Sequence, residues 1–139
     1  MLKRIHHVAI AVESLDDGAA TWGPDGIGLP EEGREDVASQ KTRVAMFPVG
    51  ESRVELIEPM EAGSAVRRHL DKRGPGIHHI CFEVDDLAAE MKRLQAAGLR
   101  FTSDAPTPGA HGSLVAFLHP KSTGGVLIEL NEFPDGDHE

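Results

Sequence analysis

Short runs of apolar and alternating residues, separated by glycine, proline and acidic residues, divide the chain into strands and amphipathic helices. Residues 87–97 carry apolar side chains at helical spacing and are followed by Gly98, a common helix stop. Each half of the chain is therefore expected to form one strand, one helix and then three strands. The expected strands cover residues 3–12, 33–38, 41–48, 51–58, 76–84, 100–102, 112–119 and 124–132, and the expected helices cover 14–22, 64–73 and 87–97.

The chain also repeats itself at an offset of about half its length. The segment IHHVAIAV at residues 5–12 recurs as IHHICFEV at residues 77–84, and VELIEP at residues 54–59 recurs as IELNE at residues 128–132. Such a repeat indicates two copies of one structural unit. We expect a single α+β domain over residues 1–139, made of two βαβββ modules. Their expected bounds are about 3–59 and 76–134, with a joining helix within 63–75 and a disordered tail at 135–139.

The repeated strands place four polar residues at matching positions. Alternation along each strand puts His7 and His79 on equivalent faces, and places Glu55 and Glu129 between apolar neighbours. A carboxylate among apolar strand residues is costly to bury unless it is paired, hydrogen-bonded or bound to a metal ion. Two histidines and two glutamates suit a divalent ion such as Co, Mn, Ni, Zn or Fe. We therefore predict a metal site formed by one histidine and one glutamate from each half.

Composition and charge narrow the classes of partner. The formal net charge is −9, which argues against nucleic acid as a ligand and requires any anion site to be locally basic or to hold a metal. No segment is apolar for the length of a membrane span, and the N-terminal residues lack a signal-peptide pattern. The single cysteine fits a reducing compartment, so we expect a cytoplasmic protein that binds no membrane.

Several other polar residues are not expected to take part in a metal or catalytic site. We expect structural roles for His6, His78 and His119, and surface or turn positions for Glu58 and Glu132. Cys81 is expected to be a small buried residue. His111 in the glycine-rich stretch GAHG is interpreted either as a loop residue or as a substrate contact. The cations that could meet phosphate groups are Arg67, Arg68, Lys72, Arg73 and Lys121.

These motifs together resemble a known family over residues 3 to 134. The segments IHHVAIAV, RVELIEP, residues 64–76, GAHG and FLHPK followed by GGVLIEL are similar to the vicinal oxygen chelate (glyoxalase-type) superfamily, and within it to methylmalonyl-CoA epimerases. The resemblance implies that the two modules form a curved, cup-like mixed sheet around one divalent metal ion. It assigns His7, Glu55, His79 and Glu129 as ligands. It also implies an acyl-CoA substrate and a homodimer.

The implied reaction interconverts 2R- and 2S-methylmalonyl-CoA by removal of the α-proton, with the resulting enolate stabilised by the metal. Glu129 is the first candidate base and Glu55 the second, while His111 and Lys121 are candidate substrate contacts. Val44 stands where some epimerases have a second catalytic glutamate, and residues 23–26 depart from the pattern of relatives. The same residues also suit a glyoxalase I type isomerase, against which the joining helix argues, or a metal-free binding protein of this fold. A ring-cleaving dioxygenase is disfavoured because it needs only one carboxylate.

Overall fold

The computed structural model describes residues 1–109 and 112–134, so His111 and the expected tail at 135–139 lie outside the described residues. The elements are β1 (Leu2–Ala11), α1 (Leu15–Trp22), β2 (Gly33–Val37), β3 (Thr42–Val49), β4 (Ser52–Pro59), α2 (Ala65–Arg73), β5 (Gly76–Val84), α3 (Leu87–Ala96), β6 (Thr107–Pro108), β7 (Leu114–Leu118) and β8 (Ile128–Glu132). The α+β class and the expected order of one strand, one helix and three strands in each half are confirmed.

The chain divides into two compact units that share two strands. One unit consists of residues 7–78, and the other consists of residues 1–6 together with the described residues from 79 onward. Strand β1 therefore begins in one unit and continues in the other, and β5 does the same in the opposite sense. His7 is the first residue of its unit, and His79 is the residue at which the chain enters the other.

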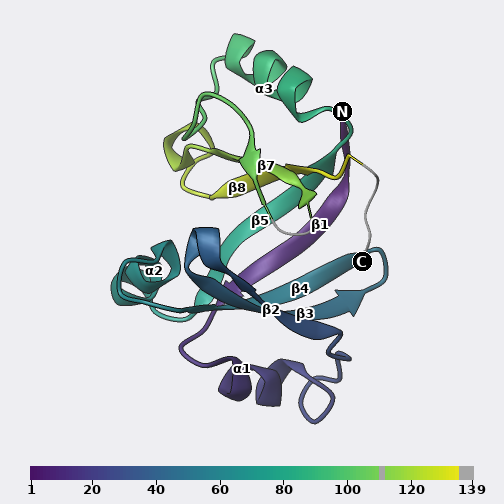
Figure 1. Ribbon diagram of the computed structural model, residues 1–139, viewed down its shortest axis with the longest axis vertical. Helices are drawn as coiled ribbons and strands as arrows, with labels where there is room; N and C mark the ends of the chain where they lie inside the picture. The colour runs from purple at the N-terminus through teal and green to yellow at the C-terminus, as the bar shows by residue number, and fades with distance from the viewer. Residues whose placement is uncertain (110–111, 135–139) are drawn as a thin grey trace. The chain divides into compact units, whose positions relative to one another are not determined.

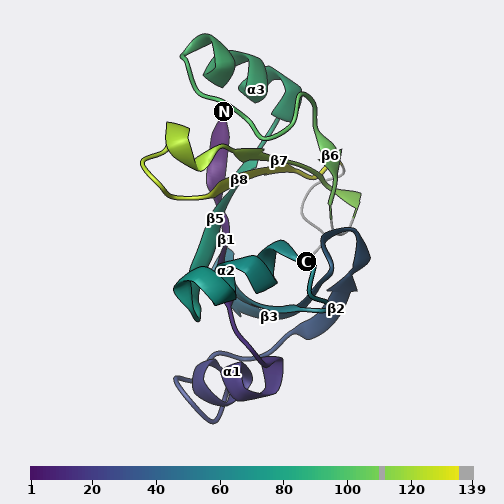
Figure 2. The ribbon, with the colours of Figure 1, turned by 90° about the vertical axis from the view of Figure 1, so that its left-hand side faces the viewer.

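The unit of residues 7–78 contains a four-stranded sheet in the order β2-β3-β4-β1, labelled in Figure 1. Strand β1 runs parallel to β4, whereas β2, β3 and β4 are antiparallel neighbours. Helix α1 packs Leu15 against Phe47 and Leu56 on one face of this sheet (Figure 2). Helix α2 packs Val66 and Leu70 against the other face. Both faces of these strands are therefore covered near the middle of the sheet.

Helix α1 forms although Gly18 lies within it. Its N-cap is Ser14, whose Oγ accepts a hydrogen bond from the Asp17 nitrogen at 3.2 Å. A β-carbon at Gly18 would lie 2.9 Å from Leu56 Cδ1. The glycine therefore lets the helix approach the sheet closely, which offsets its low helix propensity. Ser64 and Asp86 cap α2 and α3 in the same manner, through the nitrogens of Arg67 and Ala89.

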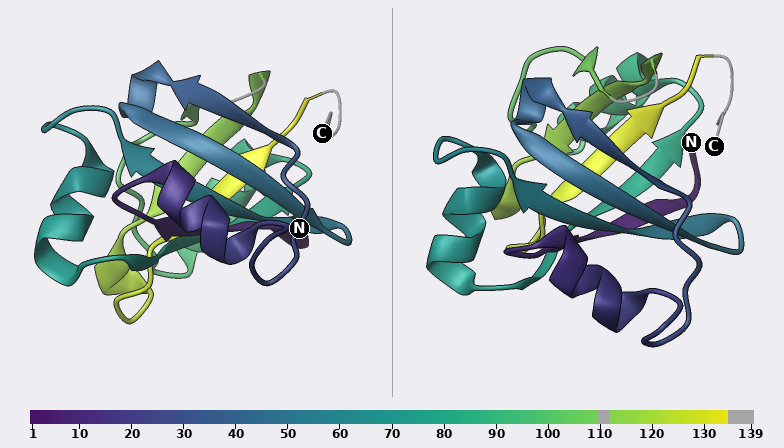
Figure 3. Two further views of the ribbon diagram at one scale, coloured as in Figure 1. Left: turned by 90° about the horizontal axis from the view of Figure 1, so that it is seen from below. Right: turned by 60° about the horizontal axis from the view of Figure 1, so that its bottom comes forward.

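The other unit contains the strand order β5-β8-β7-β6. Strand β5 is parallel to β8, and β6, β7 and β8 are antiparallel neighbours. Helix α3 packs Leu87 and Met91 against Val84, Ala116 and Leu130, on one face of these strands (α3 is labelled in Figure 2, and β8 is the yellow strand of Figure 3). The opposite face carries His79, Cys81, Glu129 and Asn131, because side chains alternate along β5 and β8. These four side chains are all buried.

The structure corrects three strand boundaries in the second half. The expected strand at 100–102 is only an isolated bridge from Phe101 to Leu118, and Phe101 packs into the core beneath α3. A short strand, β6, occurs instead at Thr107–Pro108, outside the expected strands. The strand expected at 124–132 starts only at Ile128, since positive φ angles at Gly124 and Gly125 keep the chain in a turn.

None of the helices formed by residues 1–109 and 112–134 has the length and apolar character needed to cross a lipid bilayer.

Candidate metal-binding and catalytic residues

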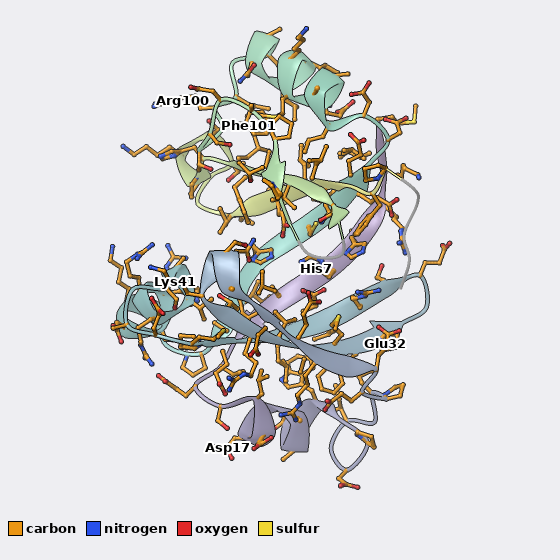
Figure 4. All side chains as sticks on the ribbon, viewed as in Figure 1. His7, Asp17, Glu32, Lys41, Arg100 and Phe101 are labelled. Atoms are coloured by element: carbon orange, nitrogen blue, oxygen red, sulfur yellow. The ribbon has the colours of Figure 1, made fainter. Side chains whose placement is uncertain are left out.

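His7 and Glu55 meet within the unit of residues 7–78. His7 projects from β1 and Glu55 from the parallel neighbour β4, where Glu55 pairs with Ala9 in the strand register. Their side chains point to the same face, and His7 Nε2 lies 3.5 Å from Glu55 Oε1. His7 is 5% exposed, and the Glu55 side chain is 14% exposed. Figure 4 labels His7 on β1 and Glu32 just before β2.

Arg53 adds a positive charge to this pair. It precedes Glu55 by two residues on β4, so both side chains share a face, and it pairs with His7 in the register of β1 and β4. An Arg53 nitrogen lies 3.9 Å from Glu55 Oε2, and another lies 4.0 Å from an oxygen of Glu32. Glu55 therefore has an imidazole near one carboxylate oxygen and a guanidinium near the other.

His79 and Glu129 form the corresponding pair in the other unit. Glu129 pairs with Cys81 in the parallel register of β5 and β8, and His79 lies two residues before Cys81 on the same face. His79 Nε2 is 2.9 Å from Glu129 Oε1. Both residues are under 9% exposed. The ring of Phe117, which is the cross-strand neighbour of Glu129, stands edge-on to the His79 imidazole at 5.8 Å between centroids.

Each unit thus holds one imidazole nitrogen and one carboxylate oxygen in close, largely buried contact. Such nitrogen and oxygen donors are groups that could hold a divalent metal ion of the middle transition series. They also satisfy the requirement that a buried carboxylate have a partner. The donor set therefore fits a metal ion, and the joining of both pairs at one ion stays a prediction.

The other residues singled out in the sequence lie outside these two His–Glu pairs. His111 lies outside the described residues. Lys121 is exposed in the 3-10 turn Pro120–Ser122, and its backbone nitrogen donates to His119 Nδ1 at 3.1 Å. His6 is buried against the ring of Phe133, at 5.0 Å between centroids, and its structural role stays a prediction. Cys81 is fully buried, as expected.

Glu58 and Glu132 are not simply surface or turn residues. Glu58 Oε1 accepts a hydrogen bond from the Leu15 nitrogen at 2.8 Å, and Glu132 Oε1 accepts one from the Leu87 nitrogen at the same distance. Each carboxylate thus binds the first residue of the helix in its own module, where the helix dipole favours negative charge. The signal was present in the sequence, because both glutamates lie three residues after the repeated Glu55 and Glu129.

Sequence reasoning also missed a set of buried polar side chains on the candidate site faces: Arg53, Ser113 and Asn131. Arg53 could have been found by alternation from Glu55, and Asn131 by alternation from Glu129. Ser113 could not, because its burial depends on the hairpin of β6 and β7, which was not expected. Among the described residues, neither Ser113 Oγ nor Asn131 Oδ1 has a hydrogen-bond partner.

Comparison with known proteins identifies the family of this chain. A sequence model described as the Glyoxalase/Bleomycin resistance protein/Dioxygenase superfamily matches residues 6–117, which include both histidines and Glu55. The chain belongs to this superfamily. Membership accounts for the duplicated modules, and it confirms the resemblance inferred from the repeated motifs.

Within the superfamily, similar proteins carry epimerase names. The chain is 39% identical over 134 residues to the ethylmalonyl-CoA/methylmalonyl-CoA epimerase of Cereibacter sphaeroides, covering 95% of this chain and 99% of that protein. The crystal structure of methylmalonyl-CoA epimerase from Mycobacterium tuberculosis matches with a TM-score of 0.87 and 37% identity, covering 94% of this chain and 88% of that chain. The Streptomyces coelicolor epimerase variant in complex with 2-nitronate-propionyl-CoA matches with a TM-score of 0.89 and 36% identity, covering 95% of each chain.

Proposed function

We propose that this protein is a methylmalonyl-CoA epimerase that interconverts the 2R and 2S forms of its substrate. The observation that carries the proposal is the His–Glu pair on equivalent strands of each unit, in a chain that matches epimerases over nearly its whole length. The relatives' names supply the substrate, and a solved epimerase structure with methylmalonyl-CoA at 36% identity supports an acyl-CoA ligand. The epimerase relatives favour this activity over the glyoxalase I reaction.

The proposal includes one divalent metal ion held by His7, Glu55, His79 and Glu129. When bound, such an ion would act as a Lewis acid that stabilises negative charge on oxygen atoms of the substrate. The four side chains offer two imidazole nitrogens and two carboxylates, and the two carboxylates balance the charge of a dication in a largely buried setting. The metal could be Co, Mn, Ni, Zn or Fe, since all accept this donor set.

Epimerisation requires that a proton leave one face of the α-carbon and return to the other. Glu129 is the first base in this proposal, because its carboxylate is buried, and His79 holds its Oε1 at 2.9 Å in a fixed orientation. Glu55 is the second candidate. To return a proton to the opposite face it would have to be protonated, and therefore released from the metal when the substrate binds. Val44, on β3, cannot take that part because its side chain has no titratable group.

The substrate is an anion, whereas the chain carries a net charge of −9. Binding therefore needs local positive charge. Lys121, exposed on its turn, and His111 are proposed contacts to the coenzyme A portion. We further propose that the enzyme acts in the cytoplasm as a homodimer. The mass of the native protein in solution tests the dimer.

The decisive experiment measures exchange of the α-proton. The metal-reconstituted protein, incubated with methylmalonyl-CoA in D₂O, is expected to incorporate deuterium at the α-carbon and to epimerise the substrate. Glu129→Gln should retain bound metal but lose most of the exchange, by about 10²-fold or more. Glu51→Gln, in the exposed turn between β3 and β4, serves as the matched control.

Two outcomes would contradict the proposal. If the wild-type protein, loaded with each of the five metals, exchanges no α-proton but isomerises a glutathione hemithioacetal, the glyoxalase reading replaces the epimerase. If Glu129→Gln exchanges the proton at the wild-type rate, Glu129 is not the base. Metal content of His7→Ala and His79→Ala, each compared with His119→Ala, tests the ligand assignment.

A further inference from the structure

Basic side chains gather on one side of helix α2, in a chain whose net charge is −9. Lys41, labelled in Figure 4, precedes β3 and lies against the segment that leads into α2, because a β-carbon at Gly63 would lie 3.3 Å from Lys41 Nζ. Arg68, on α2, donates from Nη1 to the Gly63 carbonyl at 3.0 Å. Lys72 follows Arg68 by four residues, so both side chains leave the helix on the same side. We call Lys41, Arg68 and Lys72 the α2 basic cluster.

Nearby carboxylates leave most of this charge unbalanced. Lys41 pairs with Glu61 at 3.4 Å, and such a contact between two exposed side chains contributes little. Within residues 1–109 and 112–134, Arg68 and Lys72 form no ion pair. Like charges four residues apart on a helix also repel each other. Three cations and one carboxylate therefore leave two positive charges without a partner.

The imbalance is confined to one side of α2. On another side, Arg67 pairs with Asp71 at 3.0 Å and with Glu13 at 2.7 Å. Asp71 is the single acidic residue of the helix, so it is engaged away from the α2 basic cluster. Unpaired like charges raise the free energy of the folded chain, and an anionic ligand bound to them would remove this cost.

The α2 basic cluster belongs to the same unit as His7 and Glu55. Helix α2 packs Val66 and Leu70 against the face of β1 that includes Ala11, and alternation along the strand puts His7 on this face. Ala11 lies four residues beyond His7, which is roughly 13 Å along the strand. The cluster is therefore suited to the distant end of an extended ligand whose reacting end lies at His7 and Glu55.

We propose that the α2 basic cluster binds the 3′-phosphate of the coenzyme A portion of the substrate. The inference rests on the proposed function, and it names the residues that hold the nucleotide end. The acyl group and the 3′-phosphate are at opposite ends of an acyl-CoA molecule. A phosphate monoester carries a charge of about −1.5 to −2 at neutral pH, which matches the two unpaired positive charges. The Arg68 guanidinium can donate two parallel hydrogen bonds to it, and the lysines contribute as point charges.

The other role open to Lys41 and Arg68 is structural, because both contact Gly63 and could hold the segment before α2. The two roles predict different results. A structural role predicts lower stability and an equal loss of affinity for every acyl-CoA ligand. Recognition of the 3′-phosphate predicts a loss confined to ligands that carry this group.

The test is equilibrium binding of malonyl-CoA and malonyl-dephospho-CoA to the metal-loaded full chain. The second probe lacks only the 3′-phosphate. The salt concentration is about 0.15 M, at which charges more than roughly 8 Å apart are largely screened. We expect the wild type to bind malonyl-CoA roughly ten- to hundredfold more tightly than malonyl-dephospho-CoA.

Single charge removals should weaken one probe and not the other. In Arg68→Gln and in Lys72→Gln, the Kd for malonyl-CoA is expected to rise about three- to tenfold, while the Kd for malonyl-dephospho-CoA changes less than about twofold. The double variant of Lys41→Gln and Arg68→Gln should lose most of the preference. Lys92→Gln removes an exposed charge from α3, in the other unit, and is the matched control that should change neither Kd.

Thermal unfolding and metal content are measured for every variant. If Arg68→Gln does not fold, Lys72→Gln decides, since Lys72 is exposed on the helix. Equal binding of the two probes by the wild type overturns the inference. An unchanged preference in the cluster variants overturns it too, as does a preference that is lost in Lys121→Gln alone.

Exchange of the methylmalonyl-CoA α-proton by the wild type is measured separately. A wild type that exchanges this proton but binds the two probes equally refutes only the role of the α2 basic cluster. A wild type that exchanges no α-proton refutes the proposed function, and the two Kd values still decide whether the cluster binds the 3′-phosphate. A wild type that binds neither probe overturns both.

Discussion

The carboxylate of Glu132 accepts a hydrogen bond from the backbone nitrogen of Leu87 at 2.8 Å. Leu87 is the first residue of α3, and Glu132 is the last residue of β8, the strand that carries Glu129. Glu58 and Leu15 repeat this arrangement for α1 and β4, the strand that carries Glu55. In both units, a strand that bears a proposed metal ligand is thus tied at its end to the start of a helix.

Removing either carboxylate should destabilise the fold. We expect Glu132→Ala and Glu58→Ala each to lower the free energy of unfolding by about 1–2 kcal/mol, because each leaves a helix N–H without its charged acceptor. Urea unfolding measures the change. Glu51→Ala, in an exposed turn, is the control and should be neutral. A Glu132→Ala variant as stable as this control would show that the bond contributes nothing.

Loss of the Ser113 hydroxyl should cost little. Its oxygen is buried and has no hydrogen-bond partner among the described residues, so Ser113→Ala is expected to change the free energy of unfolding by less than about 0.5 kcal/mol. Thr42 is the matched comparison, because its buried hydroxyl donates to the Gln40 carbonyl at 2.8 Å. Thr42→Val should cost about 1 kcal/mol. An equal loss in both variants would mean that the Ser113 hydroxyl is satisfied in solution.

Stability should fall in mild acid through His69. Burial, and then the positive charge of Arg73, lower the pKa of His69 below its usual value of 6.5. The unfolded chain therefore binds this proton at a higher pH than the folded chain, so stability is lost as the pH falls through the unfolded pKa. We expect the midpoint of thermal unfolding to drop between about pH 7.5 and pH 5.5, and to drop less in His69→Gln. The neighbouring His78 ring, 5.0 Å away, also faces His69. A wild type and variant with parallel profiles would exclude His69 as the source.

Gly18→Ala should destabilise the protein although it raises helix propensity. The new β-carbon would lie 2.9 Å from Leu56 Cδ1 and 3.3 Å from a Val12 methyl group, and Leu56 is fully buried. Overpacking of this kind costs about 1–3 kcal/mol, which exceeds the propensity gain of about 1 kcal/mol. Chemical denaturation measures the balance, and Ala20→Gly at an exposed position of α1 calibrates the propensity term. A stabilised Gly18→Ala would show that α1 can move away from the sheet.

The repeat made most of the fold predictable. Duplicated strands such as residues 5–12 and 77–84 carry a strong apolar pattern, and helices with Ser or Asp caps follow them. The wrongly predicted strands lie between residues 100 and 128, where the alternation of apolar and polar residues is weak. The apolar Phe101 packs in the core beneath α3 and does not belong to a strand. Strand β6 forms by pairing with β7, and the local sequence of residues 107–108 does not indicate this pairing.

The candidate site was predictable where chemistry and repetition coincide. The four predicted ligands stand at repeated positions: His7, Glu55, His79 and Glu129. In each half, the repeated strands therefore carry polar side chains that are costly to bury, and the repetition indicated a shared function. Arg53 has no counterpart in the second half, where Leu127 precedes Glu129 by two residues. It was overlooked because it stands in one copy only, and its burial depends on tertiary packing that composition cannot reveal.

Cys81 gives this protein an intrinsic reporter. It is the single cysteine of the chain, is fully buried on β5, and lies opposite Glu129 in the strand register. A thiol-modifying reagent can reach it only when that unit opens, so labelling kinetics measure the opening free energy of this half without any engineered probe. Metal ions or acyl-CoA ligands that bind at Glu129 should slow the labelling in proportion to their occupancy.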